Sequence, residues 1–263
     1  MKTNYFLERN KQNTKHIANF LNDMPDFCFE FFIGMENYTS TLTRMNYAMD
    51  LRIFFDYLSK YKFDKNAKAI TLSDLDKLTS TDIEGYLSYL TYYTFDNKNF
   101  HNGERGKARK LASVRSFLKF FYNKDKITSN VASKIQTPKL HQKDIIRLEI
   151  DEVAKILNEA ENSNFESKTQ ASYNKHTAKR DVAILSVFLG TGIRVSELVG
   201  LNIEDIDFAS NAFKITRKGG NQVVLYFSDE VKDALLEYKK QRDLLEINDN
   251  AFFLSLQKKT NFN

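Results

Sequence analysis

The chain has 263 residues, of which 42% are apolar and 28% are charged, and its formal net charge is +5. This composition is typical of a globular protein of one or two domains and excludes a collagenous or low-complexity chain. The single cysteine, Cys28, excludes an internal disulfide and a cysteine-based metal cluster. We recognise no signal peptide or bilayer-spanning run, which predicts a cytoplasmic protein with no membrane association. The positive charge favours an anionic partner.

The first part of the chain predicts an arm followed by two helices. Residues 1–22 are polar and are interpreted as an N-terminal arm or a marginal helix. Pro25 opens an aromatic-rich segment that is predicted to be helical. A longer helix should follow, capped at Thr39–Ser40 and continuing to Lys60, because its apolar residues recur at helical spacing.

Two further helices are predicted in the first half of the chain. Thr81 and Glu84 have the spacing of a capping box at the start of one of them. A polar loop is expected from Asp96 to Gly106, and the last helix follows it. The four helices together would form a domain over residues 23–130.

The fourth of these helices combines an apolar stripe with many cations. The stripe runs from Leu111 to Phe121 at helical spacing. The cations lie elsewhere on the helix and are Lys107, Arg109, Lys110, Arg115 and Lys119. Such residues often form only a solvated surface, but the segment offers few acidic partners for them. The pattern therefore favours a helix that contacts DNA phosphates, with the solvated surface as the alternative.

A domain boundary is predicted around Pro138, one of only two prolines. The segment 131–147 is polar and separates two regions with apolar periodicity, so we interpret it as a linker. Its cations include Lys139 and Lys143. A linker this basic could lie along DNA, and both lysines are candidate DNA-binding residues.

Residues 148–263 are predicted to form a second unit of helices and a small β-sheet. A helix starts at Glu149, and the polar insert from Asn162 to Lys179 is expected to be a mobile loop. The β-type runs AFKITRKGG and NQVVLYF predict a hairpin whose tip carries Arg217 and Lys218.

The segment RDVAILSVFLGTGIRVSEL is the most informative part of the sequence. An apolar helix should end at Gly190 and Gly192, where positive φ permits a sharp turn. Arg194 then opens a second helix, in which Arg194 and Glu197 lie on one face three residues apart. Val195, Leu198 and Val199 can point to a core. A guanidinium at a helix N-terminus is well placed to hold a phosphate.

This segment, with the D-I-D-F strand and lysine-bearing hairpin after it, resembles the catalytic domain of tyrosine recombinases. It is most similar to the Xer recombinases, and within them to the single-recombinase, XerS-like branch. The resemblance implies a mainly α protein with two parts. A four-helix, SAM-like core-binding domain would clamp duplex DNA, and a C-terminally truncated α+β catalytic domain with a small antiparallel β-sheet would follow.

The resemblance also implies roles for individual residues. Arg194 would stabilise the scissile phosphate, Lys218 would act as general acid for the leaving 5′ oxygen, and Glu197 would orient the site from behind them. Two alternatives stay open. Arg194 could form only a structural ion pair with Glu197, and Arg217 competes with Lys218 for the hairpin role.

The remaining catalytic residues of the family cannot be placed in this sequence. All four histidines precede Arg194, and the last tyrosines, Tyr226 and Tyr238, are interpreted as packing residues. The chain is therefore expected to be a truncated form that binds double-stranded DNA without cleaving it.

The full-length family member is expected to cleave and rejoin DNA through a phosphotyrosine, as a homotetramer and without metal or cofactor, whereas this chain would be a monomer. The expected role is chromosome dimer resolution, in chromosome partition and cell division. An integrase of a phage or conjugative element, and a non-catalytic DNA-binding protein, are the alternatives.

Overall fold

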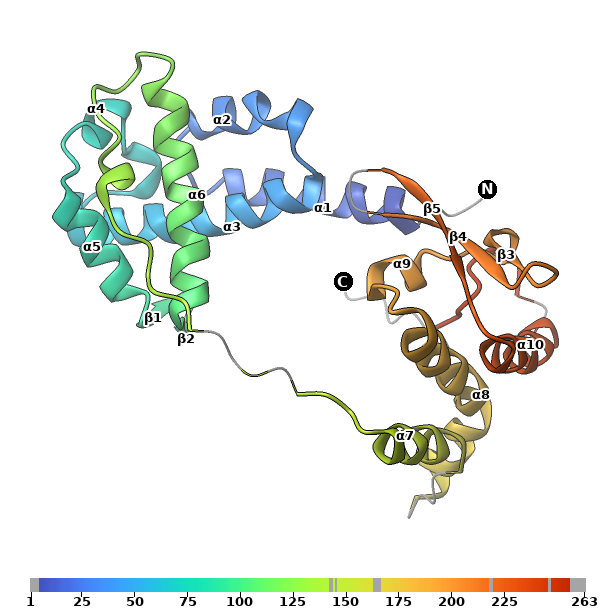
Figure 1. The fold of residues 1–263 in the computed structure, drawn as a ribbon. Coiled ribbons are helices and arrows are strands. Elements are labelled where there is room, and N and C mark those ends of the chain that lie inside the picture. Colours follow the sequence, from blue (N-terminus) through green and yellow to red (C-terminus); the bar gives the residue numbers. More distant parts are fainter. Residues whose placement is uncertain are drawn as a thin grey trace. The chain divides into compact units, whose positions relative to one another are not determined.

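The computed structural model describes residues 5–141, 144, 146–162, 167–217, 220–245 and 247–255. The chain forms two compact units: the helical unit comprises Arg9–Asp144, and the α+β unit comprises Ile145–Asn263 together with Met1–Glu8. The structure is mainly helical, as predicted (Figure 1). Each unit has its own apolar core. None of the helices in the described ranges has the length and hydropathy needed to cross a membrane.

The helical unit is built around two long helices that pack against each other. Its main elements are α1 (Tyr5–Leu21, which belongs to this unit from Arg9 onward), α2 (Cys28–Gly34), α3 (Thr41–Leu58), α4 (Leu72–Leu75), α5 (Ser80–Tyr89), β1 (Tyr92–Phe95), β2 (Lys98–His101) and α6 (Glu104–Tyr122). Helices α3 and α6 cross at its centre (Figure 1). Phe55 on α3 and Phe117 on α6 are fully buried and meet edge to face, with ring centroids 5.7 Å apart. The apolar stripe predicted from Leu111 to Phe121 faces this core.

Capping interactions determine where the helices of this unit begin. Ser40 precedes α3 and accepts a backbone hydrogen bond at 3.2 Å, as the sequence predicts. The capping box of α5 consists of Thr79 and Asp82, so the prediction of Thr81 and Glu84 is wrong. Both pairs have the required spacing, but the carboxylate that accepts the N–H of the capping residue, at 2.7 Å, belongs to Asp82.

A β-hairpin occupies much of the segment predicted as a polar loop from Asp96 to Gly106. Strands β1 and β2 are antiparallel and are joined by Asp96 and Asn97, whose φ angles are 49° and 59°. Positive φ at both positions is typical of the type I′ turn, which matches the twist of a two-residue hairpin. The loop prediction is wrong because it treats a turn-forming pair as part of a longer polar connection.

Both ends of the helical unit differ from the boundaries expected from the sequence. The segment 1–22 contains the well-formed helix α1, in which Asn13 is buried and donates a hydrogen bond to Thr41 Oγ1 at 3.2 Å. The segment 131–147 begins inside the unit, because Ala132 is fully buried. Both segments are polar, and each has only a few buried side chains. Their sequences therefore do not indicate that they pack against the helical unit.

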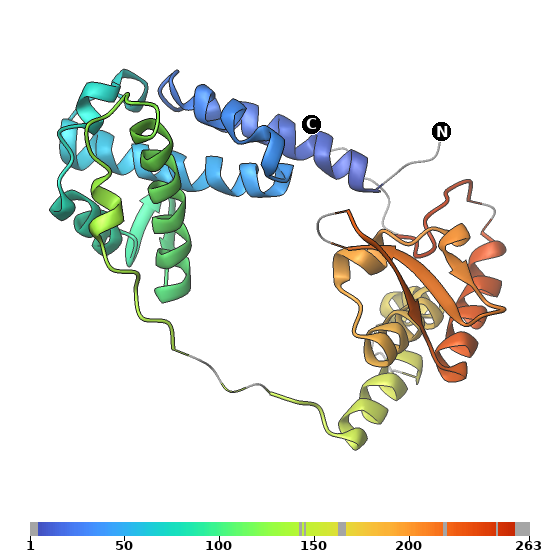
Figure 2. The ribbon, with the colours of Figure 1, turned by 45° about the horizontal axis from the view of Figure 1, so that its top comes forward.

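The α+β unit contains helices and a three-stranded antiparallel sheet. Its elements are α7 (Ile150–Asn162), α8 (Lys168–Thr191), α9 (Val195–Val199), β3 (Ile206–Asp207), β4 (Ala212–Thr216), β5 (Gln222–Tyr226) and α10 (Asp229–Asp243). The strand order is β3-β4-β5, and the long hairpin of β4 and β5 is visible in Figure 2. Its register pairs Ala212 with Tyr226 and Thr216 with Gln222. The predicted hairpin is thus confirmed.

The polar insert predicted from Asn162 to Lys179 is largely helical, so the prediction of a loop is wrong. From Lys168 onward it forms the first half of α8, while residues 163–166 lie outside the described ranges. Helix α7 packs against α8, and Thr177 is buried. The residues of this half have adequate helix propensity, and tertiary packing supplies the stability that their weak periodicity does not indicate.

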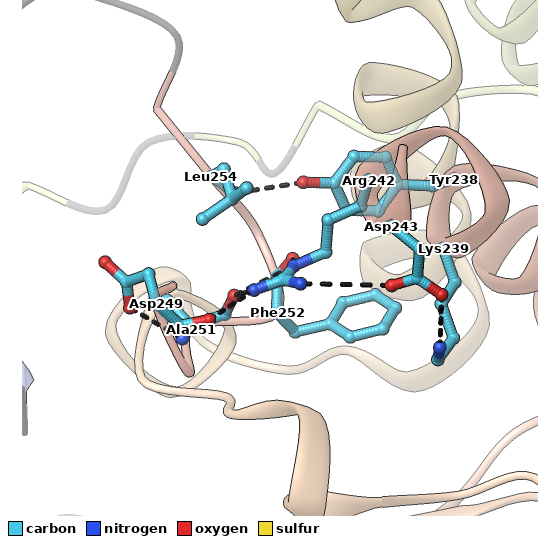
Figure 3. A network of polar contacts seen from close by, with 8 residues as sticks. All are labelled: Tyr238, Lys239, Arg242, Asp243, Asp249, Ala251, Phe252 and Leu254. Carbon is cyan, nitrogen blue, oxygen red and sulfur yellow. Dashed lines mark hydrogen bonds and ion pairs between the residues drawn. The ribbon is translucent and has the colours of Figure 1, made fainter. Parts of the chain in front are cut away.

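A buried arginine contributes several of the contacts that hold the last described residues against the unit. Arg242 on α10 is 5% exposed. Its guanidinium donates hydrogen bonds, at 2.6–3.2 Å, to the carbonyl oxygens of Asp249, Ala251 and Phe252 (Figure 3). The buried Tyr238 hydroxyl accepts a hydrogen bond from the Leu254 N–H at 2.9 Å. Tyr238 is therefore a packing residue, as predicted, and the segment is fixed both through its backbone and through the fully buried Phe252 ring, which contacts Tyr238.

Candidate active site and DNA-binding residues

The turn before Arg194 is set by two glycines with different roles. Gly192 ends α8 with φ of 63°, and its N–H donates to the Phe188 carbonyl oxygen at 3.0 Å. Gly190 is still helical, and a Cβ there would lie 2.7 Å from Val231 Cγ2. The sequence predicts positive φ at both glycines. Of the two, Gly192 has it and Gly190 does not. Gly190 instead allows α8 to approach α10 closely.

Arg194 is the N-cap of α9, and within the described ranges its guanidinium is held from the side of Glu197. Its N–H donates to Glu197 Oε2 at 3.1 Å, and Nη1 donates to Glu197 Oε1 at 2.9 Å. The Arg194 side chain is 66% exposed, whereas that of Glu197 is 5% exposed. The predicted pair therefore exists: a buried carboxylate fixes a cation whose remaining surface faces solvent.

Helix α9 contributes less than its sequence pattern indicates. It has only five residues, so the guanidinium must supply most of the positive charge at its start. Leu198 is buried, but Val195 and Val199 are 66% and 40% exposed. The expectation that all three point to the core is wrong, because the two buried positions of this short helix are taken by Leu198 and by Glu197, which leaves no continuous apolar face.

The pKa of Glu197 reflects a balance between burial and positive charge. Burial works to raise this pKa, but hydrogen bonds from the Arg194 backbone and side chain, with the charges of Arg194 and Arg217, lower it below the ordinary value. Glu197 is therefore a carboxylate at neutral pH and can neutralise part of the Arg194 charge.

The hairpin closes next to Arg217, which is exposed. Its N–H donates to the Asn221 carbonyl oxygen at 2.8 Å, and its carbonyl oxygen accepts from the Gly220 N–H at 3.0 Å. Lys218, the predicted general acid, lies outside the described residues. A hollow of about 160 Å³ has Glu197, Thr216 and Gln222 among its lining residues. The strands therefore bring the hairpin base towards the carboxylate that holds Arg194.

Tyr226 is not a packing residue, because it is 72% exposed. It pairs with Ala212, at the end of the hairpin opposite Thr216 and Gln222. It lies four positions along the extended strand from Gln222, a distance of about 13 Å. Tyr226 thus lies at the end of the ribbon remote from the Arg217 turn.

The cations of α6 have more internal partners than the sequence indicates. Lys110 is 5% exposed, and its Nζ lies 3.2 Å from Asn102 Oδ1. Arg115 donates to the Ala132 carbonyl oxygen at 3.0 Å and to the Ile135 carbonyl oxygen. These two residues therefore have structural roles that account for their presence in the helix.

The other predicted DNA-binding residues are more accessible. Lys107 donates to Thr91 Oγ1 at 2.7 Å and is half-buried, and Lys119 and Lys139 are exposed. Lys143 lies outside the described residues. Arg109 is half-exposed and pairs with a carboxylate of α3.

That carboxylate, Asp50, is the residue that sequence reasoning missed. It is fully buried, and Arg109 Nη1 donates to its Oδ2 at 2.6 Å. The sequence of α6 offers few acidic partners of its own, whereas Asp50 comes from another helix, 59 positions before Arg109. The signal in the sequence is a single acidic residue inside the apolar run AMDLRIFF.

Comparison with known proteins agrees with these features. Residues 147–261 match the phage integrase family. The chain is 32% identical over 237 residues to the tyrosine recombinase XerC of Caldanaerobacter subterraneus subsp. tengcongensis, covering 83% of this chain and 61% of that protein. It is 31% identical to the XerC of Natranaerobius thermophilus, covering 89% and 71%. The chain thus spans less than two thirds of the first of these relatives.

Two solved structures show the same fold. The XerH site-specific recombinase bound to difH substrate matches with a TM-score of 0.55 and 17% identity, covering 91% of this chain and 72% of that one. A lambda integrase dimer bound to a COC′ core site matches with a TM-score of 0.56 and 17% identity, covering 88% and 72%. The sequence similarity to the Natranaerobius protein, with the family match over the α+β unit, establishes the assignment. The chain belongs to the tyrosine recombinase, or phage integrase, family and is Xer-like.

Proposed function

We propose that this chain is the DNA-binding and phosphate-holding part of a site-specific recombinase that cleaves and rejoins DNA through a phosphotyrosine. The observation that carries the proposal is the Arg194–Glu197 pair. A scissile phosphate gains negative charge as it becomes pentavalent, and a fixed, always ionised guanidinium stabilises that charge. Because Glu197 holds Arg194 from its buried side, the donors of the guanidinium need little reorganisation when DNA binds.

The hairpin supplies the second cation in this proposal. Lys218 would protonate the leaving 5′ oxygen, and the adjacent Arg217 is the alternative for that role. No step requires a metal or cofactor. The test uses a family member that contains this chain and its tyrosine nucleophile, with DNA whose bridging 5′ oxygen is replaced by sulfur. Sulfur leaves without a proton, so cleavage by Lys218→Ala should return on this substrate. Rescue of Arg217→Ala instead would transfer the role to Arg217.

The chain by itself is proposed to bind double-stranded DNA as a monomer without cleaving it. Support comes from its last two tyrosines, since Tyr238 is buried in a backbone contact and Tyr226 lies at the end of the ribbon remote from Arg217. Incubation with a nicked recombination site should give no covalent protein–DNA adduct on a denaturing gel. An adduct would contradict the proposal, and light scattering would show whether the chain is monomeric.

DNA binding is tested separately from cleavage. Fluorescence anisotropy with a labelled duplex should give an affinity that falls steeply with salt, because bound cations displace counterions from the phosphates. An affinity independent of salt would contradict the proposal. The full-length protein is proposed to act as a homotetramer on two duplexes.

The biological role proposed is chromosome dimer resolution, which would place the protein in the cytoplasm and in chromosome partition and cell division. Similarity to proteins named XerC and XerD supports it. Assignment to the XerS-like branch stays a prediction. An integrase of a mobile element is the second candidate, because transposon integrases share this fold. A non-catalytic DNA-binding protein is the third, and it would be favoured if the family member with its tyrosine intact and no other substitution cleaved neither the oxygen nor the sulfur substrate.

A further inference from the structure

A buried carboxylate at the centre of the helical unit has no evident stabilising purpose. Asp50 lies on α3 with its side chain 0% exposed, next to the fully buried Leu51. Its Oδ2 accepts hydrogen bonds from Arg109 Nη1 at 2.6 Å and Ser113 Oγ at 2.8 Å. Its Oδ1 has no hydrogen-bond partner among the described residues and lies 3.7 Å from Lys110 Nζ.

Such a group is a poor way to stabilise a core. Removing a carboxylate from water carries a large desolvation penalty, and apolar replacements of buried ion pairs are often as stable or more stable. Burial raises the pKa of Asp50 even against the charges of Arg109 and Lys110, which shows that this penalty is not fully offset. The cluster therefore requires an explanation other than stability.

What Asp50 does is fix one arginine while leaving it accessible. The Arg109 side chain is 49% exposed, and within the described ranges its guanidinium makes no other hydrogen bond. Arg115, two turns further along α6, differs because all three of its nitrogens bond to the fold. Arg109 thus has donors left for a ligand, and Asp50 limits the rotamers from which they act.

We propose that Asp50 is a positioning residue that holds the Arg109 guanidinium in the orientation in which it binds a DNA phosphate. The inference rests on the DNA binding proposed above. A long, flexible side chain loses rotamer freedom when it binds, and holding it in place beforehand reduces this loss. A planar guanidinium gains most, because its fork must align with the phosphate oxygens.

The test is a double-mutant cycle in a Lys110→Met background. Lys110 is 6% exposed, and removing Asp50 alone would leave its charge buried and unpaired, so the Met background avoids unfolding for that reason. Binding to a labelled duplex of mixed sequence is measured by anisotropy over a salt series, and thermal unfolding verifies that each variant is folded. Asp50→Asn should weaken binding about fivefold when Arg109 is present. In a chain with Arg109→Gln, Asp50→Asn should not change the affinity for the duplex, because no guanidinium is left for Asp50 to position.

Two controls separate positioning from structure and from charge. Asp96→Asn removes a carboxylate that pairs with Arg52, a largely covered arginine of the same unit, and changes the net charge by the same amount. It should not weaken binding. Ser113→Ala keeps the charge of Asp50 but removes one of its hydrogen bonds, and should give a smaller loss that also depends on Arg109.

The outcomes are distinguishable. An equal loss for Asp50→Asn with and without Arg109, or no loss with Arg109 present, would overturn the inference while leaving DNA binding intact. A wild-type chain without salt-dependent binding would overturn the proposed function itself.

Discussion

Each of the two units contains an accessible arginine that is held by a buried carboxylate, and the two pairs are built differently. In the α+β unit, Glu197 follows Arg194 by three residues, and both of its oxygens accept hydrogen bonds from that residue. In the helical unit, Asp50 precedes Arg109 by 59 positions and keeps one oxygen that has no hydrogen bond to any described residue. When the two residues are close in sequence, the arginine backbone can also donate a hydrogen bond to the carboxylate. When they are distant, only side chains can do so, and part of the free-energy cost of burying the carboxylate is not offset.

The largest test of this difference removes Asp50 from the otherwise natural chain. Asp50→Ala should lower the free energy of unfolding by about 3–5 kcal/mol, because it leaves Lys110 charged and buried without a carboxylate. Urea unfolding followed by tyrosine signals of the helical unit measures the change. The double variant Asp50→Leu with Lys110→Met should recover most of the loss, since it buries no charge. If the double variant is as unstable as the single one, the cluster supports the fold in some other way.

Loss of the local carboxylate should matter less. Glu197→Gln should cost about 1–2 kcal/mol, because a buried acceptor is weakened while Arg194 stays solvated. Denaturant unfolding of the α+β unit gives the value, with Glu204→Gln, at a less buried position, as the control. A cost as large as that of Asp50→Ala would show that the two pairs are energetically alike.

The pKa values of the two carboxyl groups should be shifted in opposite directions from their ordinary values. The pKa of Glu197 is lowered, so its contribution to stability is complete above the ordinary glutamate pKa of 4.5 and is lost as pH falls through the lower folded value. The pKa of Asp50 is raised above 3.8, so its unfavourable contribution grows as pH rises from that value through the folded pKa. Carbon-13 NMR titration of the two carboxyl groups measures both midpoints. pKa shifts of the same sign would contradict the proposed difference between the two pairs.

The smallest expected effect concerns a cation that is paired with no carboxylate in the described part of the chain. Lys119 is exposed on α6, and Lys119→Gln should lower the slope of log affinity against log salt by about one if it contacts a phosphate. Lys155→Gln, at an exposed lysine paired with Asp151, is the matched control. An unchanged slope for Lys119→Gln would leave that residue as part of the solvated surface.

Patterns within one element were predictable from the sequence. The cap at Ser40, the apolar stripe of α6, the β4–β5 hairpin and the Arg194–Glu197 pair all depend on spacings of a few residues. These features follow from helix and strand periodicity, which the sequence states directly.

Features that depend on tertiary packing were not predictable in the same way. The first half of α8 is polar and becomes helical beside α7, and the Asp50–Arg109 pair requires that α3 and α6 cross at one level. The β1–β2 hairpin is an intermediate case, since Asp96 and Asn97 are a turn signal that the surrounding polar residues obscure. Contacts between distant segments carry no local spacing, and for that reason Asp50 was missed.

The clamp formed by Arg242 has a consequence for which substitutions the protein tolerates. The acceptors of its guanidinium are carbonyl oxygens, which every amino acid provides. Asn250 and Ala251 can therefore diverge among relatives without altering the path of the segment, because their contacts with the rest of the unit are made by the main chain. Arg242 itself has no such freedom, since lysine lacks the planar fork that reaches several carbonyls at once. Among relatives, the residues that supply the carbonyl oxygens should therefore vary more than Arg242.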